Sequence, residues 1–314
     1  MTGAEAQLRL LPWRLVAAIF AVFAVCVGAS VAALGPAAAP GAMAGVLVGF
    51  FGTLFGDRRR SALAIVVVAL ATAASATAPD WARFVVVAPA LSILTGWEAA
   101  RSGTRAAVFA AMAWILLHAP AADGAGAPLF VAFGCSAVLG LVSALRFGVE
   151  GRAARDAAGL VYGIMLGTAM AIGLALAFLI AQRFDSSHSQ WIALMFVARG
   201  LDPPREHARG ALRTGLGAAA GAGAAGAALA LPLPAWAFAS AAVVLLLSGL
   251  RLLPAGTPLS PALISGAIIL GVAPSPDSAL FRAEAAAIAA GLAVALSFGV
   301  GRLTRAVMGF REGR

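Results

Sequence analysis

Long apolar stretches, separated by short polar connections, are the feature that most restricts how this chain can fold. Only 11% of the residues are charged, whereas 62% are hydrophobic, and a soluble domain carries roughly a quarter charged residues. Too few polar residues remain to cover a water-facing surface. The sequence therefore predicts an all-α, polytopic integral membrane protein.

About twelve of these stretches qualify as membrane spans, because a spanning helix needs about 20 apolar residues and at least about 17. Several are short, and the connections between them leave no room for a soluble domain. The candidate spans are Leu15–Leu34, Gly41–Gly56, Ser61–Ala78, Ala82–Gly96, Thr104–His118, Ala127–Leu145, Leu160–Ala181, Trp191–Val197 with its flanks, Leu212–Leu231, Ala235–Leu250, Pro258–Val272 and Arg282–Val300.

The distribution of arginine predicts the orientation in the membrane. All 22 basic residues are arginine, and all but Arg83, Arg183 and Arg282 fall in alternate connections or at the termini. Because basic residues concentrate on the cytoplasmic side, we expect both termini in the cytoplasm. The stretch Leu15–Leu34 is longer than a signal-peptide core, so we interpret it as a retained first span.

The two halves of the chain resemble each other. At an offset of about 151–155 residues, Trp81 aligns with Trp236 and Arg60 aligns with Arg213. Six spans per half is an even number, so both halves should insert with the same polarity, in two parallel repeats. The predicted organisation is a first six-helix repeat over 1–148, a cytoplasmic linker over 149–158 and a second six-helix repeat over 159–314.

Several classes of protein are excluded by what the sequence contains. The net charge of +9 does not indicate a nucleic-acid-binding protein, because no basic patch is interleaved with aromatic residues. Cys26 and Cys135 lie inside apolar stretches, and no group of residues has metal-ligand spacing. We find no paired catalytic carboxylates, nucleophile motif or phosphate-binding loop. We therefore expect no enzymatic activity, no metal and no cofactor.

Glycine-rich faces occur in two of the predicted helices. Gly41, Gly45 and Gly49 recur at a spacing that places them on one helix face, and the stretch 215–226 repeats this pattern. Small residues allow helix backbones to approach closely in lipid, so we interpret both faces as packing surfaces. The alternative is that these faces slide or line a narrow path.

Polar residues near the ends of spans are candidates for a substrate pathway. Arg209 and Arg213 share a helix face if the ninth predicted helix, over Leu212–Leu231, begins before Arg209. Two guanidinium groups on one face would bind a carboxylate. The alternative is that these arginines only set the orientation. His118 suits a proton relay by residue type, although it also fits an interface position. The candidate pathway residues are Arg199, Arg205, Arg209, Arg213, His188, Trp191 and His118.

This region resembles the membrane part of the fusaric-acid-resistance (FUSC-like) proteins, relatives of the aromatic acid exporters. The similarity lies in a tryptophan that opens one helix, followed by an Arg-x-x-x-Arg pattern that enters a glycine-rich helix. The family follows its second arginine with Gly-Thr, whereas this chain has Thr214-Gly215. The matching residues are the segment 188–194, Arg205, Arg209, Arg213, Gly217 and Gly221.

The resemblance implies an inner-membrane (plasma-membrane) permease that exports small organic anions, possibly aromatic acids, and leaves open whether it forms a homo-oligomer. Two alternatives remain. Segment 52–60 resembles the Gly-x-Leu-x-Asp-Arg loop of major facilitator transporters, with Gly56 inserted before Asp57. The scarcity of charges within the spans also fits a membrane scaffold subunit that transports nothing.

Overall fold

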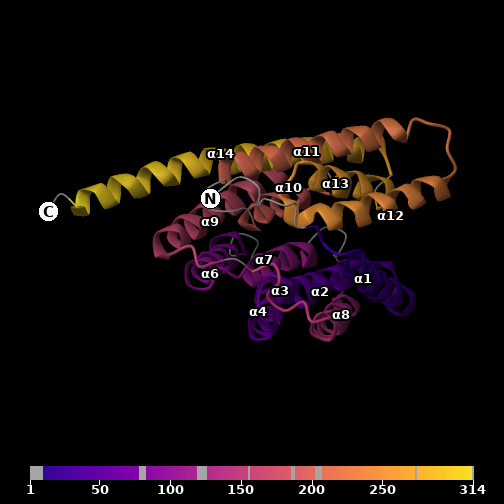
Figure 1. Ribbon diagram of the computed structural model, residues 1–314, viewed down its shortest axis with the longest axis horizontal. Coiled ribbons are helices and arrows are strands. Elements are labelled where there is room, and N and C mark those ends of the chain that lie inside the picture. Colours follow the sequence, from indigo (N-terminus) through magenta and orange to yellow (C-terminus); the bar gives the residue numbers. More distant parts are fainter. Residues whose placement is uncertain are drawn as a thin grey trace. The chain divides into compact units, whose positions relative to one another are not determined.

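The computed structural model of the protein describes residues 10–77, 83–118, 126–154, 156–184, 188–201, 207–272 and 274–312 (Figure 1). The chain forms two compact units. Unit 1 comprises Met1–Phe20 and Ala208–Gly291, and unit 2 comprises Ala21–His207 and Leu292–Arg314. These boundaries differ from those of the predicted repeats over 1–148 and 159–314, and the internal repeat stays a prediction.

Every regular element in the described ranges is helical, as expected for an all-α protein. A helix occupies each of the twelve stretches identified in the sequence. In chain order the elements are α1 (Trp13–Leu34), η1 (Pro36–Ala38), α2 (Ala39–Val46), η2 (Leu47–Phe51), α3 (Gly52–Leu54), α4 (Arg58–Thr77), η3 (Arg83–Val87), α6 (Ala88–Arg101), α7 (Ala106–Leu117), α8 (Gly126–Arg146), α9 (Leu160–Ala181), α10 (Gln190–Val197), η5 (Ala198–Leu201), α11 (His207–Ala228), α12 (Ala235–Leu252), η7 (Leu253–Ala255), α13 (Leu259–Gly271) and α14 (Pro276–Glu312).

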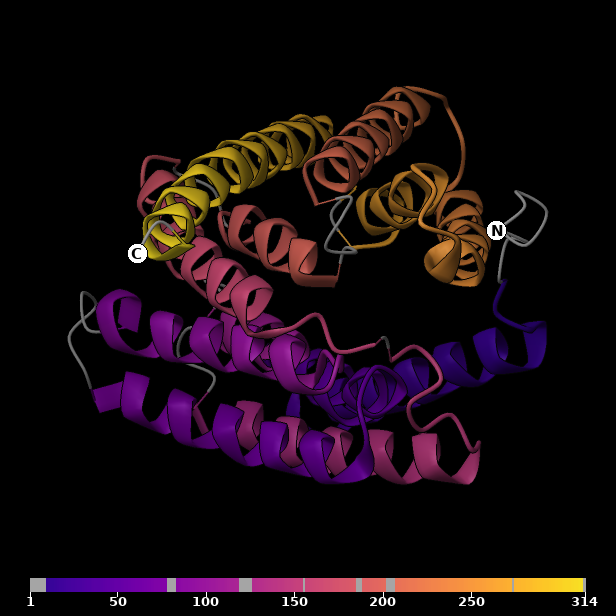
Figure 2. The same ribbon diagram turned by 60° about the vertical axis from the view of Figure 1, so that its left-hand side comes forward.

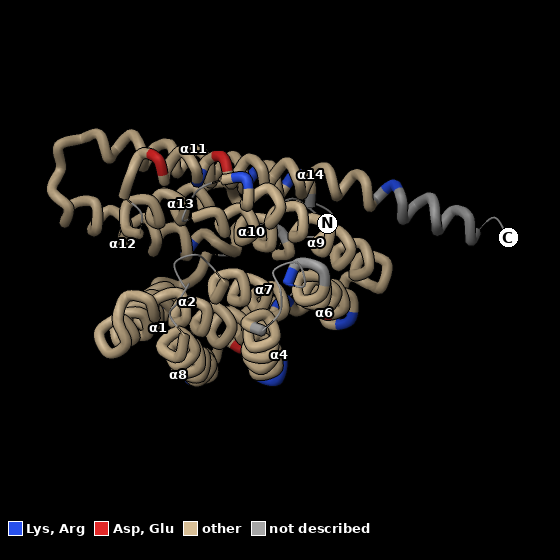
Figure 3. Tube along the Cα trace, turned by 180° about the vertical axis from the view of Figure 1, so that it is seen from behind, with Lys and Arg blue, Asp and Glu red and all other residues tan. Residues whose placement is uncertain are grey.

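Among the described residues, 7 helices are long and apolar enough to cross a membrane. Long uncharged stretches separate isolated charged residues along the described trace (Figure 3). Twelve crossings stay a prediction, because α6, α7, α10 and α13 are shorter than the span length of about 17 residues, and α11 is not among the helices that are apolar enough. The span-length helices are Trp13–Leu34, Pro36–Leu54, Arg58–Ala76, Gly126–Arg146, Leu160–Ala181, Ala235–Ala255 and Pro276–Val300.

In unit 2, α2 packs on α8, α6 packs on α9, and α7 packs on α2, α4 and α6. Figure 2 shows the helices from a second direction. The glycine face of α2 lies directly on the backbone of α8. A Cβ atom added at Gly45 would lie 2.4 Å from the carbonyl oxygen of Phe133, and one at Gly49 would lie 2.1 Å from that of Ala137. The packing interpretation of this face is therefore confirmed.

The second span of unit 2 contains a π-helical turn, η2, between α2 and α3. A π turn frees carbonyl groups from the regular i to i+4 pattern. The hydroxyl of Ser61, which is fully buried on α4, donates to the carbonyl oxygen of Val48 at 2.7 Å and lies 3.2 Å from that of Gly49. This side chain therefore ties α4 to the irregular turn.

Replacing Ser61 with alanine is expected to lower the free energy of unfolding by about 1–2 kcal/mol, because it leaves a buried carbonyl without its donor. Ser297→Ala is the matched control, since the Ser297 hydroxyl donates only to Ala293 of its own helix. Equilibrium unfolding of both variants in detergent measures the difference. Equal stability of the two variants would contradict this role for Ser61.

Unit 1 contains a second close glycine contact, between α11 and α13. A Cβ atom at Gly217 would lie 2.1 Å from the carbonyl oxygen of Pro258, and one at Gly221 would lie 1.9 Å from that of Ala262. Both contacts advance by four residues in the same direction, so the two helices run parallel. α12 packs on α13 through Gly249, which faces Ile264.

Candidate functional site

Two carboxylates lie at the start of α4, that of Asp57 from the turn before this helix and that of Glu150 from the connection after α8. The Asp57 side chain accepts a hydrogen bond from the backbone N–H of Arg60 at 2.9 Å, which is the geometry of a helix N-cap. The Glu150 side chain accepts from the backbone N–H of Arg58 at 2.8 Å. Negative charge is favourable at a helix N-terminus, so both contacts stabilise this end of α4.

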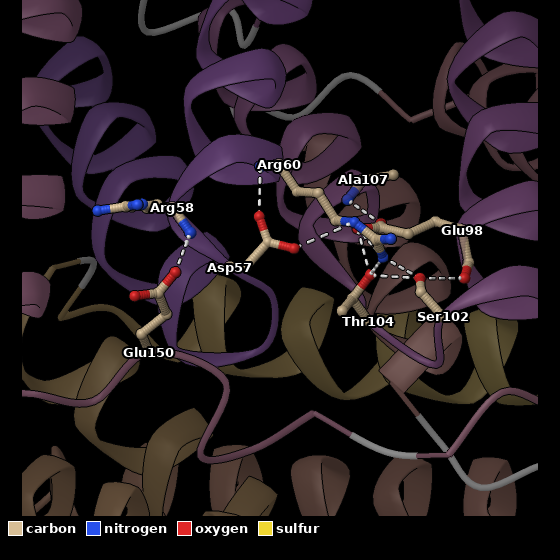
Figure 4. Close-up of polar contacts among 8 residues, drawn as sticks. All are labelled: Asp57, Arg58, Arg60, Glu98, Ser102, Thr104, Ala107 and Glu150. Carbon is tan, nitrogen blue, oxygen red and sulfur yellow. Dashed lines mark hydrogen bonds and ion pairs between the residues drawn. The ribbon is translucent and has the colours of Figure 1, made fainter.

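Arg60 extends from this turn to the connection between α6 and α7 (Figure 4). Its guanidinium Nη1 donates to the hydroxyl groups of Ser102 and Thr104. Its Nε lies 3.3 Å from Asp57 Oδ2, and its Nη1 lies 4.0 Å from Glu98 Oε1. We call Asp57, Arg60, Glu98, Ser102 and Thr104 the Arg60–Glu98 node.

Glu98 is the buried charge of this node, with 4% of its surface exposed. Its Oε1 accepts the hydroxyl hydrogen of Thr104 at 2.7 Å, and its Oε2 accepts the backbone N–H of Ala107 at 2.7 Å. Burying a charge is costly unless it is paired and hydrogen-bonded. Arg60 and these donors meet that condition and join the ends of α4, α6 and α7.

Arg105, the residue that follows Thr104, is also almost fully buried, with 2% of its surface exposed. Its Nη1 donates to the carbonyl oxygen of Thr104 at 2.9 Å, and its backbone N–H donates to that of Phe55 at 3.0 Å. The start of α7 is thereby held against the end of α3. Two arginines and one buried carboxylate thus meet at this end of the α4–α7 pair.

A second polar cluster lies at the other end of the same helix pair. The indole N–H of Trp114 donates to Ser75 Oγ at 3.1 Å, and Arg83 Nε donates to the carbonyl oxygen of Ser75 at 3.0 Å. His118 Nδ1 lies 2.8 Å from the carbonyl oxygen of Trp114, so Nδ1 carries the hydrogen. His118 therefore ends α7 by bonding to its own helix, and a proton-relay role stays a prediction.

The structure brings His188 and Trp191 together at the start of α10, with ring centroids 4.5 Å apart. Trp191 is buried within unit 2, with 6% of its surface exposed. The backbone of Arg199 lies in η5, whereas its side chain and the whole of Arg205 lie outside the described residues.

Arg209 and Arg213 both lie in the first turns of α11, in unit 1. The helix begins at His207, before the predicted start at Leu212. The two side chains are exposed and four residues apart, so they share one helix face. The early helix start that Arg209 and Arg213 need in order to share one face is therefore observed.

The sequence pattern did not identify Glu98, Ser102, Thr104 and Glu150 as members of a polar site. The available signal was the occurrence of Glu98 and Arg101 close together between apolar stretches. No protein-family model, curated protein or solved structure matches this chain.

Proposed function

We propose that this protein is a FUSC-like inner-membrane permease that exports small organic acids. The observation that carries the proposal is the Arg60–Glu98 node, in which a buried carboxylate pairs with a partly buried arginine at one end of helices in an apolar bundle. Charges within membrane segments are costly and commonly mark a transport pathway or a moving pair.

The proposed mechanism uses the arginines of α11 as the first contact for the substrate. Arg209 and Arg213 present two guanidinium groups on one exposed helix face, which suits a carboxylate. The Arg60–Glu98 node holds three helix ends together, and its rearrangement would open a path in an alternating-access cycle. A proton gradient or the gradient of the substrate itself would drive export.

Efflux from whole cells tests this function. Cells with and without the protein are loaded with labelled aromatic and aliphatic weak acids, and the release of each acid is followed with and without a protonophore. We expect protein-dependent release of at least one acid, which the protonophore abolishes. Equal release across the panel would contradict organic-acid export and would favour an unrelated major-facilitator substrate or the scaffold role.

The double variant Arg209→Gln/Arg213→Gln is expected to reduce efflux by about tenfold or more, because each lost charge-assisted contact weakens anion binding by roughly that factor. The matched control is Arg58→Gln/Arg59→Gln, which removes two exposed arginines at the start of α4. Membrane insertion of all variants is measured on immunoblots of membrane fractions. Equal efflux by the two double variants would remove Arg209 and Arg213 from the mechanism.

A further inference from the structure

A threonine hydroxyl lies buried without a partner between the two polar clusters of the α4–α7 pair. Thr72 has 4% of its surface exposed, and its Oγ1 has no hydrogen-bond partner within the part of the chain that the structure describes. A buried hydroxyl group normally has a partner, and in a helix it commonly donates to the carbonyl oxygen four residues earlier. Ser75, on the next turn of α4, donates in this way to Ala71 at 2.7 Å. The Thr72 hydroxyl is therefore a hydrogen-bonding group that a bound molecule would satisfy.

The neighbours of Thr72 on α4 show that it faces α7. Val68 and Ala64 precede it by four and eight residues, so all three lie on one helix face, and both belong to an apolar cluster with residues of α7. Ser75, three residues after Thr72, accepts the indole N–H of Trp114 from α7. We call the contact between the two helices the α4–α7 seam, and its apolar part consists of Ala64, Val68, Ala106, Ala110, Ala113 and Leu117.

Each end of the α4–α7 seam carries an arginine. The Arg60–Glu98 node joins the starts of α4 and α7, and the contact of Ser75 with Trp114 joins their ends, so the two helices run in the same direction. Arg60 donates to two hydroxyl groups at the first end, and Arg83 donates to the carbonyl oxygen of Ser75 at the second. Because a guanidinium group suits a carboxylate, both ends of the seam are suited to an organic anion.

The α4–α7 seam is packed less tightly than the glycine contacts of the neighbouring helices. α7 packs on α2 and on α6 as well as on α4, and α2 lies on the backbone of α8. α6 lies on α9 in the same way, since a Cβ atom at Gly96 would lie 2.2 Å from the carbonyl oxygen of Gly163, and one at Gly163 would lie 2.4 Å from that of Gly96. α4 and α7 contain no glycine and meet mainly through alanine. Hydrophobic stabilisation grows with the apolar area that is buried, so alanine faces separate at a smaller cost than leucine faces.

We propose that the α4–α7 seam is the route of the exported acid, and that the Thr72 hydroxyl donates a hydrogen bond to the carboxylate of that acid inside it. The apolar part of the seam closes the route in this structure, as apolar constrictions close other membrane pathways. Separation of α4 from α7 begins at the Arg60–Glu98 node, which joins their starts. This inference rests on the proposed function, since it specifies the path of the exported acid.

The first test is Thr72→Val, which removes the hydroxyl and keeps the shape of the side chain. We expect acid efflux to fall by about tenfold, because a hydrogen bond to a charged group is lost. The unfolding temperature should stay the same or rise, since the variant removes a buried hydroxyl that has no partner. The matched control is Thr95→Val. Thr95 has 1% of its surface exposed, but its hydroxyl donates to the carbonyl oxygen of Leu91 in its own helix at 2.9 Å, so this variant should export acid as the wild type does.

The second test is cysteine labelling, which does not require export. Thr72→Cys is combined with Cys26→Ala and Cys135→Ala, and the purified protein in phosphatidylcholine nanodiscs is treated with sulfonatoethyl methanethiosulfonate, a water-soluble anionic thiol reagent. A permanently buried thiol is inert, whereas a route that opens exposes it. We expect Thr72→Cys to be labelled, and benzoate to slow the labelling by about tenfold. Val66→Cys in the same background is the control, because Val66 lies on the outer face of α4, 52% exposed, where lipid excludes the reagent.

Three outcomes would overturn the inference. A Thr72→Cys variant that resists the reagent contradicts a route through the seam, and labelling that benzoate does not slow shows that the seam opens to water but not to the acid. Efflux by Thr72→Val equal to that of the wild type contradicts the hydrogen bond from Thr72. The result is separable from the proposed function. If acids are exported but Thr72→Cys is not labelled, only the route is wrong, and if benzoate protects Thr72→Cys but no acid is exported, only the export proposal fails.

Discussion

Replacing Glu98 with alanine is expected to lower the free energy of unfolding by about 2–4 kcal/mol, because a buried donor left without its acceptor costs roughly 1–3 kcal/mol. The variant leaves the Ala107 N–H and the Thr104 hydroxyl without the acceptor that now lies 2.7 Å from each of them. It also leaves Arg60 beside a single carboxylate, that of Asp57. Equilibrium unfolding of the purified protein in detergent measures the loss.

Glu150→Ala is the matched control for this prediction. Glu150 also accepts a backbone N–H at a helix N-terminus, that of Arg58 at 2.8 Å, but at an exposed position. An exposed contact of this kind contributes about 0.3–1 kcal/mol, so Glu150→Ala should unfold close to the wild type. A Glu98→Ala variant as stable as Glu150→Ala would show that the node does not stabilise unit 2.

Sequence patterns predict the helices of this protein well because each pattern is local. The apolar stretch 160–181 and the helix α9 coincide, and the glycine spacing in α2 predicts a packing face, which in the structure lies on α8. The length of a crossing is less predictable. Pro258 and Pro274 bound the stretch of α13 closely, and proline breaks or begins helices, so this helix has only 13 residues.

The Arg60–Glu98 node could not be predicted in the same way. Its members come from the turn before α4, the start of α4, the end of α6 and the connection after α6. Contacts between distant segments carry no periodicity in the sequence. Ser102 and Thr104 are ordinary turn residues by local criteria, and only their distance to Arg60 identifies them as part of a polar site.

The positive character of the α11 region was predictable, but its partners were not. The arrangement Arg209-x-x-x-Arg213 indicates a shared helix face directly. That α11 lies against the start of α13 is shown only by the contact of Gly217 with Pro258. Tertiary packing of this kind depends on the whole unit and leaves no local pattern in the sequence.

Gly221→Ala is expected to destabilise unit 1 strongly and to reduce acid efflux. The added methyl carbon would lie 1.9 Å from the carbonyl oxygen of Ala262 and 2.7 Å from its Cα atom. Both are backbone atoms, which cannot rotate away as a side chain does, so α11 and α13 must move apart. Overpacking commonly costs about 1–3 kcal/mol, and we expect the upper end of this range.

Gly223→Ala provides the control on the same helix. A Cβ atom at Gly223 has no neighbour within 4 Å, and the residue is exposed. The change should leave packing intact and stabilise the helix by about 0.5–1 kcal/mol, because alanine favours helix more than glycine does. Thermal unfolding and efflux are measured for both variants at equal amounts in the membrane.

The contrast between the two glycine variants also tests the link from packing to function. If the arginines of α11 act only while α11 lies on α13, Gly221→Ala should reduce acid efflux even under conditions where the protein is still folded. Gly223→Ala should export acid as the wild type does. Unchanged efflux by folded Gly221→Ala would mean that Arg209 and Arg213 act without the contact between α11 and α13.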